Sequence, residues 1–499
     1  MSDVASYSPS HPLRLASVER WDMETDVVVV GFGAAGSCAT IEAARAGARV
    51  CVLEAAGGAG GSAALSGGEV YVGGNGGTPI QRSAGFEDRT EDFYRYLMLA
   101  GGPGADEAKV RLYAESALAH FHWLEAQGVP FKGTYLPGKW LEPVTDDTLT
   151  WSGSEEAWPF AEEARPAPRG HAVQMSGMGA GRVLMERLAA RATDTGAEIH
   201  YDSRALTLIA DVDNHVHGIV VRIDGVPRFV HAKRGVILCA GGFVMNEAMR
   251  RRYAPETMCC SYPVSGGYDD GSGIRMGIGV GAAAINMDQF FCTMPFFPPE
   301  SLVKGIFVNE SGARFVNEDA YHGRVAHYIL HQPNARAWLL VDNATFDRPV
   351  TKPDIEVSAV GESWAEVESE LAMPVGALCR TVNIFNQYAA KGQDPAFHKA
   401  TKWLRPLLTP PFAALNYCAE DYGVAVFTLG GLDTLPTGEV LDADGNIICG
   451  LYAAGRTACG LPRWGEGYSS GMSIGDSTFF GRQAGLTAAN HIAKTSANR

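Results

Sequence analysis

Three glycines near the start of the chain have the types and spacing of a phosphate-binding turn. Gly31, Gly33 and Gly36 follow a run of valines in the pattern G-x-G-x-x-G. The first glycine permits a tight turn, the second lets the backbone approach a pyrophosphate, and the third allows close helix–strand packing. The helix that follows offers N–H groups and partial positive charge to the phosphates. Glu54 ends the next apolar run and can bind ribose hydroxyls, so the pattern indicates a dinucleotide site.

Glycine clusters later in the chain distinguish between the two common dinucleotides. An NAD enzyme needs only the first strand–turn–helix–strand unit, whereas FAD has a long ribityl and isoalloxazine arm that needs further contacts. Three clusters can supply them, at residues 60–63, 240–242 and 450–456. They favour FAD.

The elements that position these residues follow from hydrophobic patterning. Residues 57–77 are expected to form an irregular loop because they are rich in glycine. The predicted strands are 26–30, 48–53, 198–201, 205–213, 218–224 and 235–239, and the predicted helices are 37–46, 87–127 and 179–196. Residues 205–224 are expected to pair as antiparallel strands.

The order of these elements predicts an α/β fold with a discontinuous Rossmann-like dinucleotide domain and an inserted α+β domain. The segment 286–425 carries few features of alternating strands and helices, and closely spaced glycines occur again after it. The predicted division is 1–285 and 426–499 for the dinucleotide domain and 286–425 for the insertion.

Composition and charge exclude several classes of function. The 499 residues include 41 Lys and Arg against 56 Asp and Glu, a net charge of −15, which argues against a nucleic-acid partner. No segment approaches the ~20 apolar residues that span a bilayer. The ten cysteines are scattered and form no C-x-x-C pair, so neither a disulfide framework nor a metal site is expected. These features predict a cytoplasmic protein.

Motifs over nearly the whole chain resemble those of a known flavoprotein family. They are DVVVVGFGAAG, VLEAAGGAGGSAALSGG, VILCAGGF, YDDGSG, VNESGARFVNE, TLGGLDTLPTGEVLDADGNIICGLYAAGR and GYSSGMSIG, in this order. The chain is similar to the fumarate reductase and succinate dehydrogenase flavoproteins, and more narrowly to their 3-ketosteroid dehydrogenase branch. The resemblance implies an FAD domain with an inserted catalytic domain and the flavin at their junction.

The resemblance also implies which residues hold the cofactor. They are Gly31, Gly33, Ala34, Ala35, Gly36, Glu54, Ala55, Gly61, Ser62, Ala63, Ser66, Gly67, Gly68, Ala205, Ala240, Gly241, Gly242, Asp270, Gly455, Arg456, Ser473 and Ile474. Members with covalent FAD carry a histidine near the position of Gly61 and Ser62, so a non-covalent flavin is expected. Arg456 departs from the family, because many relatives have Glu there.

Two segments carry groups for dehydrogenation beside a ketone, which needs a donor to the carbonyl, a base for the α proton and a hydride acceptor. They are residues 319–324 and the loop 467–475. The resemblance to 3-ketosteroid Δ4-(5α)-dehydrogenases implies that Tyr321, Tyr468 and Ser470 are catalytic. We expect Ser470 and Tyr321 to relay the proton, and Tyr468 and the Gly471 amide to polarise the ketone. The reverse assignment of the two tyrosines stays open.

An aromatic stretch suits a rigid apolar substrate. Buried apolar area contributes about 25 cal/mol per Å², and apolar walls with a few polar anchors fit a steroid. The predicted substrate-binding residues are Phe290, Phe291, Phe296, Phe297 and Trp464. The alternative is that they form the core of the inserted domain.

The expected function is therefore FAD-dependent conversion of 5α-3-ketosteroids to 4-ene-3-ketosteroids, with an electron acceptor that the sequence does not identify. A 3-ketosteroid Δ1-dehydrogenase and a fumarate-reductase-like ene reductase are the enzymatic alternatives. The ene reductase needs an arginine proton donor, for which Arg314, Arg324 and Arg463 are available. The remaining alternative is a flavin-binding electron carrier without turnover.

Overall fold

A run of four valines builds the central strand of the main sheet in this computed structural model, which describes residues 7–491. β-branched residues favour strands, and Val27–Val30 are buried on both faces, as in parallel sheets. Strand β2 (Met23–Val30) pairs in parallel with β3 (Val50–Leu53) on one side and β11 (Val226–Leu238) on the other.

The nine-stranded sheet extends from this centre in both directions. Its order is β1 (Leu13–Arg14), β9 (Arg204–Ala210), β10 (Val216–Ile223), β11, β2, β3 and β8 (Glu198–His200), with β21 (Glu439–Leu441) and β22 (Ile447–Ala453) joined through β11. Strand β22 pairs in parallel with β11, so the last part of the chain returns to the first sheet. The antiparallel pair predicted over residues 205–224 is confirmed as β9 and β10.

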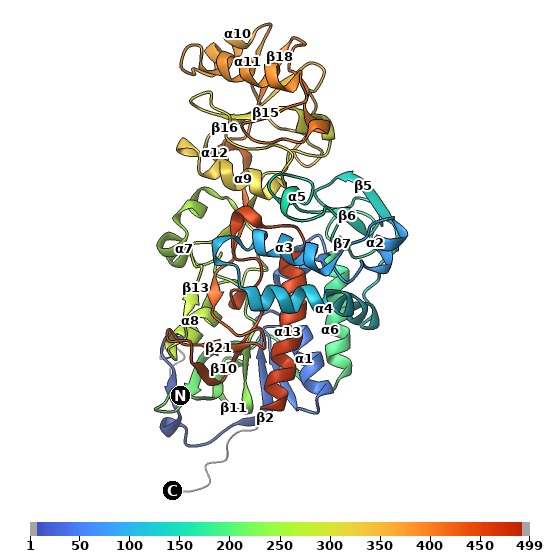
Figure 1. The fold of residues 1–499 in the computed structure, drawn as a ribbon. Helices are drawn as coiled ribbons and strands as arrows, with labels where there is room; N and C mark the ends of the chain where they lie inside the picture. Colours follow the sequence, from blue (N-terminus) through green and yellow to red (C-terminus); the bar gives the residue numbers. More distant parts are fainter. Residues whose placement is uncertain (1–6, 492–499) are drawn as a thin grey trace.

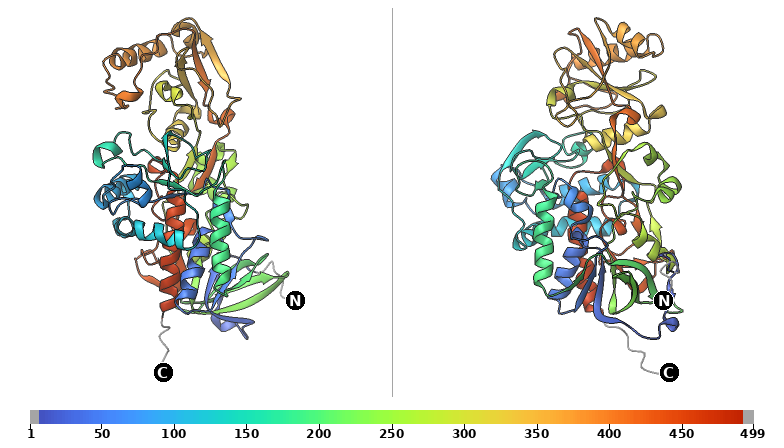
Figure 2. Two further views of the ribbon diagram at one scale, coloured as in Figure 1. Left: turned by 90° about the vertical axis from the view of Figure 1, so that its right-hand side faces the viewer. Right: turned by 180° about the vertical axis from the view of Figure 1, so that it is seen from behind.

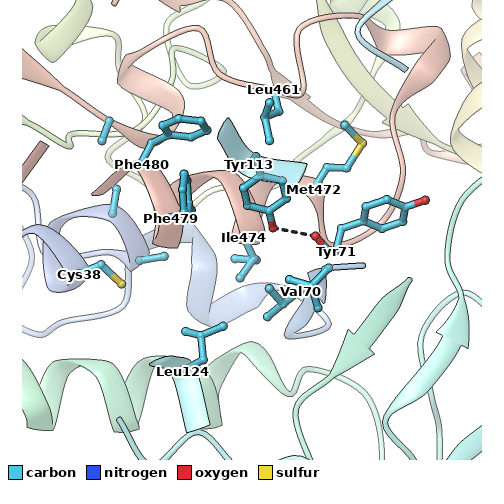
Figure 3. Packing of buried hydrophobic residues seen from close by; sticks show 14 of the residues in the cluster. Cys38, Val70, Tyr71, Tyr113, Leu124, Leu461, Met472, Ile474, Phe479 and Phe480 are labelled. Carbon is cyan, nitrogen blue, oxygen red and sulfur yellow. Dashed lines mark hydrogen bonds between the residues drawn. The ribbon is translucent and has the colours of Figure 1, made fainter. Parts of the chain in front are cut away.

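Helices α1 (Ala34–Arg45) and α13 (Met472–Asn490) lie side by side against this sheet, with α6 (Gly181–Asp194) beyond α1 (Figures 1 and 2). Glycines on α13 permit the close approach, since a Cβ at Gly481 would lie 2.5 Å from the Ala35 carbonyl oxygen. Figure 3 shows the apolar cluster around α13, in which the Tyr113 hydroxyl donates to the Tyr71 carbonyl at 2.7 Å.

Two predictions of local structure were wrong. The loop 57–77 contains a 3₁₀ turn at Gly61–Leu65 and the strand β4 (Glu69–Tyr71), which is held by pairing with the distant β7 (Gly170–Ala172). The helix predicted over 87–127 is two helices, α3 (Thr90–Ala100) and α4 (Glu107–Ala126), because the intervening Gly-Gly-Pro-Gly interrupts the helical hydrogen bonds. Strands β4 and β7 continue through β6 (Leu149–Trp151) to β5 (Tyr135–Lys139), and α2 (Pro79–Ser83) and α5 (Phe160–Glu163) complete this region.

The upper part of the molecule in Figure 1 is a second unit of α+β type. Its antiparallel sheet has the order β15 (Ile306–Asn309), β16 (Ala337–Asp342), β18 (Phe412–Asn416) and β17 (Val357–Gly361). Helices α10 (Trp364–Glu370) and α11 (Ala377–Ala389) pack on it, and α12 (Ala419–Tyr422) follows β18. The predicted fold class is confirmed, while the domain boundaries at 285/286 and 425/426 stay a prediction.

Between the two parts lies the segment that leads to the candidate site. Strand β14 (Phe290–Thr293) pairs antiparallel with β19 (Ala425–Thr428), which also pairs with β12 (Tyr262–Pro263). Helix α9 (His322–Leu330) packs against β14. The remaining smaller elements are α7 (Glu247–Tyr253), α8 (Ser272–Gly279) and the antiparallel pair β13 (Ala284–Ile285) and β20 (Gly431–Leu432). Over residues 7–491, no helix is both long and apolar enough to cross a bilayer.

Candidate active site

A cavity of about 460 Å³ lies where these parts of the chain meet. Its walls come from the turn after β2, the loop before β4, strands β14 and β19, and the first residues of α9 and α13. Helices α1, α9 and α13 all begin at this cavity without a side-chain cap on their first N–H groups. Their N-termini therefore place positive potential along the walls, which suits a diphosphate and an oxyanion.

The end of the cavity at α1 has the geometry of an adenosine diphosphate site. Gly33 caps α1 with backbone only, and a Cβ on Gly36 would overlap the Gly31 carbonyl, so the turn accepts no larger residue there. The Glu54 carboxylate accepts hydrogen bonds from the Phe32 N–H at 2.7 Å and the Ala56 N–H at 2.8 Å. Burial raises the pKa of Glu54, and these backbone donors oppose the rise.

Most of the predicted cofactor residues border this one cavity. They are Gly31, Gly33, Ala34, Ala35, Glu54, Ala55, Gly61, Ser62, Ala63, Ser66, Gly67, Gly68, Ala205, Ala240, Gly241, Gly455, Arg456, Ser473 and Ile474. Gly36, Gly242 and Asp270 do not border it. Gly36 lies beneath the turn, and Asp270 pairs with Arg204. The uncapped helix start, the ribose-binding carboxylate and the glycine walls fit FAD.

Asp269, which was not among the predicted cofactor residues, borders the cavity in place of Asp270. Its carboxylate accepts hydrogen bonds from Ser62, from the Gly242 N–H at 3.0 Å, and from Arg456 at 3.1 Å. The Arg456 charge lowers the pKa of Asp269 against the effect of burial. The Arg456 guanidinium is therefore neutralised by a buried carboxylate on the cavity wall.

The two predicted catalytic segments meet at the other end of the cavity. Tyr321 precedes α9, and its hydroxyl lies 2.7 Å from Ser470 Oγ. The Tyr321 N–H donates to Ser154 Oγ at 3.1 Å, which fixes the backbone there. The Tyr468 hydroxyl donates to Ser473 Oγ at 3.1 Å, and Gly471 starts α13 with a φ of +91°. All four predicted catalytic residues border the cavity.

Burial keeps both tyrosines protonated. It raises the pKa of Tyr468 to about 12 and that of Tyr321 well above the ordinary value near 10. Both phenols are therefore hydrogen-bond donors at neutral pH rather than bases. The N–H of Gly471, at the start of a helix, has no acceptor within that helix and adds a second donor beside Tyr468.

A buried carboxylate stands beside this group and was not foreseen from the sequence. Glu69 borders the cavity as the first residue of β4 and is only 6% exposed. The Thr150 hydroxyl donates to Glu69 Oε1 at 3.4 Å. Burial raises the pKa of Glu69 to about 8, and the Ser470 hydroxyl opposes this rise.

Aromatic rings form part of the wall near the tyrosines. The Phe291 ring lies 4.3 Å from that of Tyr468 and 4.8 Å from that of Phe427, centroid to centroid. His322 also borders the cavity, with Nδ1 2.6 Å from Thr293 Oγ1. Burial lowers the pKa of His322 to about 3, so this imidazole is neutral.

Four of the five residues predicted to bind substrate do not border the cavity: Phe290, Phe296, Phe297 and Trp464. Successive strand residues point to opposite faces, so Phe290 turns away where Phe291 turns in. Phe290, Phe296 and Phe297 belong to the apolar core that continues into the inserted unit. Trp464 packs on Gly102.

Comparisons with known proteins match this geometry. Residues 26–470 match the FAD binding domain family. The crystal structure of 3-ketosteroid-Δ4-(5α)-dehydrogenase from Rhodococcus jostii RHA1, in complex with 4-androstene-3,17-dione, is similar with a TM-score of 0.90 and 41% identity. That match covers 96% of this chain and 99% of that one.

Two relatives found by sequence are more distant. The 3-oxo-5-alpha-steroid 4-dehydrogenase of Comamonas testosteroni is 27% identical, over 87% of this chain and 93% of the relative. A probable fumarate reductase of Shewanella frigidimarina is 29% identical, over 94% of this chain and 75% of the relative. The chain belongs to the FAD-binding flavoprotein family that includes steroid dehydrogenases and fumarate reductases, and its cofactor is FAD.

Proposed function

We propose that this protein is an FAD-dependent dehydrogenase that converts 5α-3-ketosteroids to 4-ene-3-ketosteroids. The observation that carries the proposal is the Tyr321–Ser470 hydrogen bond beside Tyr468 in a cavity with an FAD-binding turn. The steroid product bound in the Rhodococcus relative supports the substrate class.

The residues divide the reaction into two parts. The Tyr468 hydroxyl and the Gly471 N–H donate to the C3 ketone oxygen and stabilise the negative charge that grows there as the C4 proton leaves. Ser470 Oγ, bonded to Tyr321, takes that proton. Bound FAD would supply the acceptor for the hydride that leaves C5. We also propose that the flavin is held without a covalent bond, because Gly61 and Ser62 occupy the wall where covalent members carry histidine.

The positions of the three candidate proton-donor arginines favour a steroid dehydrogenase over a reductase that acts on a small dicarboxylate. Arg314 pairs with Glu318 and Asp394, and Arg463 pairs with Asp106. Arg324 donates to the Glu466 carbonyl at 3.1 Å. None of these three arginines borders the cavity.

All ten cysteines are free, which supports our proposal that the protein acts in the reducing cytoplasm. An external electron acceptor completes the catalytic cycle, since the steroid leaves two electrons on the protein at each turnover.

The test is anaerobic mixing of the yellow protein with 5α-androstane-3,17-dione, with the flavin absorbance followed and the product identified. Loss of flavin colour with a 4-ene product is the expected result. A 1-ene product would move the assignment to the Δ1-dehydrogenases. No loss of colour would refute the steroid proposal, and oxidation of the reduced protein by fumarate would then identify an ene reductase.

A further inference from the structure

The proposed reaction does not yet name the group that finally accepts the proton from C4 of the steroid. Ser470 can take the C4 proton only if its own hydroxyl proton leaves at the same time, because a serine hydroxyl is a weak base unless another group accepts its proton. Tyr321 is the obvious neighbour, yet its hydroxyl is already protonated and its burial disfavours the phenolate. The relay therefore needs an ionisable acceptor on the other side of Ser470.

Glu69 occupies that position. Strand β4, which begins with Glu69, is tied to the catalytic loop because the Tyr71 N–H donates to the Gly471 carbonyl at 3.1 Å. Glu69 and Ser470 both border the cavity, and the Glu69 backbone lies directly beside the catalytic loop, because a Cβ on Gly471 would lie 3.2 Å from the Glu69 carbonyl carbon. Ser470 is the hydroxyl that lowers the pKa of the Glu69 carboxyl most, and the Tyr321 hydroxyl lies 2.7 Å from the same Ser470 oxygen. The order of groups is therefore Tyr321, Ser470, Glu69, with Thr150 supporting the carboxylate.

We propose that Glu69 is the terminal proton acceptor of the site and receives, through Ser470, the proton that leaves C4. This inference rests on the proposed steroid dehydrogenation. The C4–H bond breaks and its proton bonds to Ser470 Oγ, while the Ser470 O–H bond breaks and that proton bonds to the Glu69 carboxylate. The electron pair of the C4–H bond becomes the C3=C4 bond of an enolate, whose oxygen is held by Tyr468 and Gly471. The C5–H bond then breaks, with bound FAD as the group that would accept the hydride, while the enolate pair becomes the C4=C5 bond and the C3 carbonyl re-forms. Glu69 releases its proton to water after the product departs.

The surroundings of Glu69 suit this role. Burial, followed by the negative charge of Glu142, raises the pKa of Glu69 to about 8, while hydrogen bonds from Ser470 and Thr150 oppose the rise. A base with a pKa near the working pH transfers protons most effectively. The titratable groups that face it from the packed elements are Glu142, Glu155, Tyr321, His322 and Tyr468.

The test compares the rate of flavin reduction by 5α-androstane-3,17-dione in the wild-type holoenzyme and in Glu69→Gln, from about pH 6 to about pH 10. The wild-type rate is expected to rise with pH through about 8, as Glu69 becomes ionised. Glu69→Gln should lower the rate about 10²–10⁴-fold and remove this inflection, with the flavin content unchanged. Glu69→Asp should restore part of the rate and the inflection.

Glu142→Gln is a second variant with an independent prediction. It removes a negative charge that raises the pKa of Glu69, so the inflection in the rate should move to lower pH. This variant decides the question if Glu69→Gln does not fold. An inflection that stays at the wild-type pH in Glu142→Gln would contradict the assignment of that inflection to Glu69.

The inference is overturned if Glu69→Gln keeps its rate within about threefold and retains the wild-type pH profile. This result is distinct from failure of the proposed function, in which the wild-type flavin is not reduced by the steroid at any pH. In that second case both the steroid dehydrogenase function and the role of Glu69 are refuted. A wild type that makes the 4-ene product beside an unaffected Glu69→Gln refutes the role of Glu69 alone.

Discussion

Replacement of Gly471 by alanine tests whether the backbone at the start of α13 positions the catalytic loop. Gly471 has a φ of +91°, and a Cβ there would lie 2.8 Å from the Tyr71 backbone nitrogen. Ordinary contact for a Cβ begins at 3.4 Å, so the loop or β4 must move by about 0.6 Å. The Tyr71 N–H to Gly471 carbonyl hydrogen bond restrains that movement.

The loss of folding stability expected for Gly471→Ala has two parts. A left-handed backbone costs an alanine about 1–2 kcal/mol, and the overpacking adds about 1–3 kcal/mol. Gly445→Ala is the matched control, because Gly445 has a φ of +80° and no atom within 4 Å of its added Cβ. The control should lose only the first part. The displacement also moves Ser470 and Tyr468, and misplacement by about 1 Å costs ~10² in rate, so a 10- to 100-fold loss is expected for Gly471→Ala.

The assays are the rate of flavin reduction by the steroid and the temperature of thermal unfolding of both variants. Gly471→Ala should react more slowly and unfold at a lower temperature than Gly445→Ala, which should react at the wild-type rate. If Gly471→Ala reacts within about threefold of wild type and is no less stable than Gly445→Ala, the backbone contact does not position the loop.

Three further outcomes are expected. Tyr468→Phe should lower the rate of flavin reduction about 10²–10³-fold at unchanged flavin content, and a rate near wild type would show that its hydroxyl does not bind the ketone. Glu54→Ala should lose flavin on gel filtration, because the carboxylate that faces the ribose is gone; full retention would contradict this role. Burial lowers the pKa of His171 in the folded protein to about 4, below its ordinary value of 6.5. The unfolded chain therefore binds a proton at His171 more readily than the folded protein does. The stability that neutral His171 contributes is lost as pH falls from about 6.5 through about 4. His171→Gln should flatten the fall of the unfolding temperature over this range, and an unchanged slope would assign the acid lability elsewhere.

The turn at Gly31 and Gly33, with Glu54 after the next strand, was predictable because its chemistry is local to one strand–turn–helix unit. The meeting of Tyr321 and Ser470 was not, since 149 residues separate them and only the family resemblance joined them. Glu69 was missed because a carboxylate within a glycine-rich segment gives no indication of burial until β4 finds β7. More phenylalanines were expected on the cavity wall than lie there, because strand alternation in β14 turns Phe290 away from the cavity and Phe296 and Phe297 pack in the core that continues into the inserted unit.

The close packing of α1 on α13 has a consequence for the synthesis of the protein. Helix α13 leaves the ribosome roughly 440 residues after β2, which at about 5–20 residues per second is a delay of about 20–90 s. Throughout that interval the small-residue face of α1, at Ala35 and Ala39, lacks the glycines Gly481 and Gly485 that will cover it. The helix that begins at the nucleotide-binding turn therefore gains its packing partner α13 only at the end of translation. Until then the exposed face of α1 can make incorrect contacts with other parts of the nascent chain.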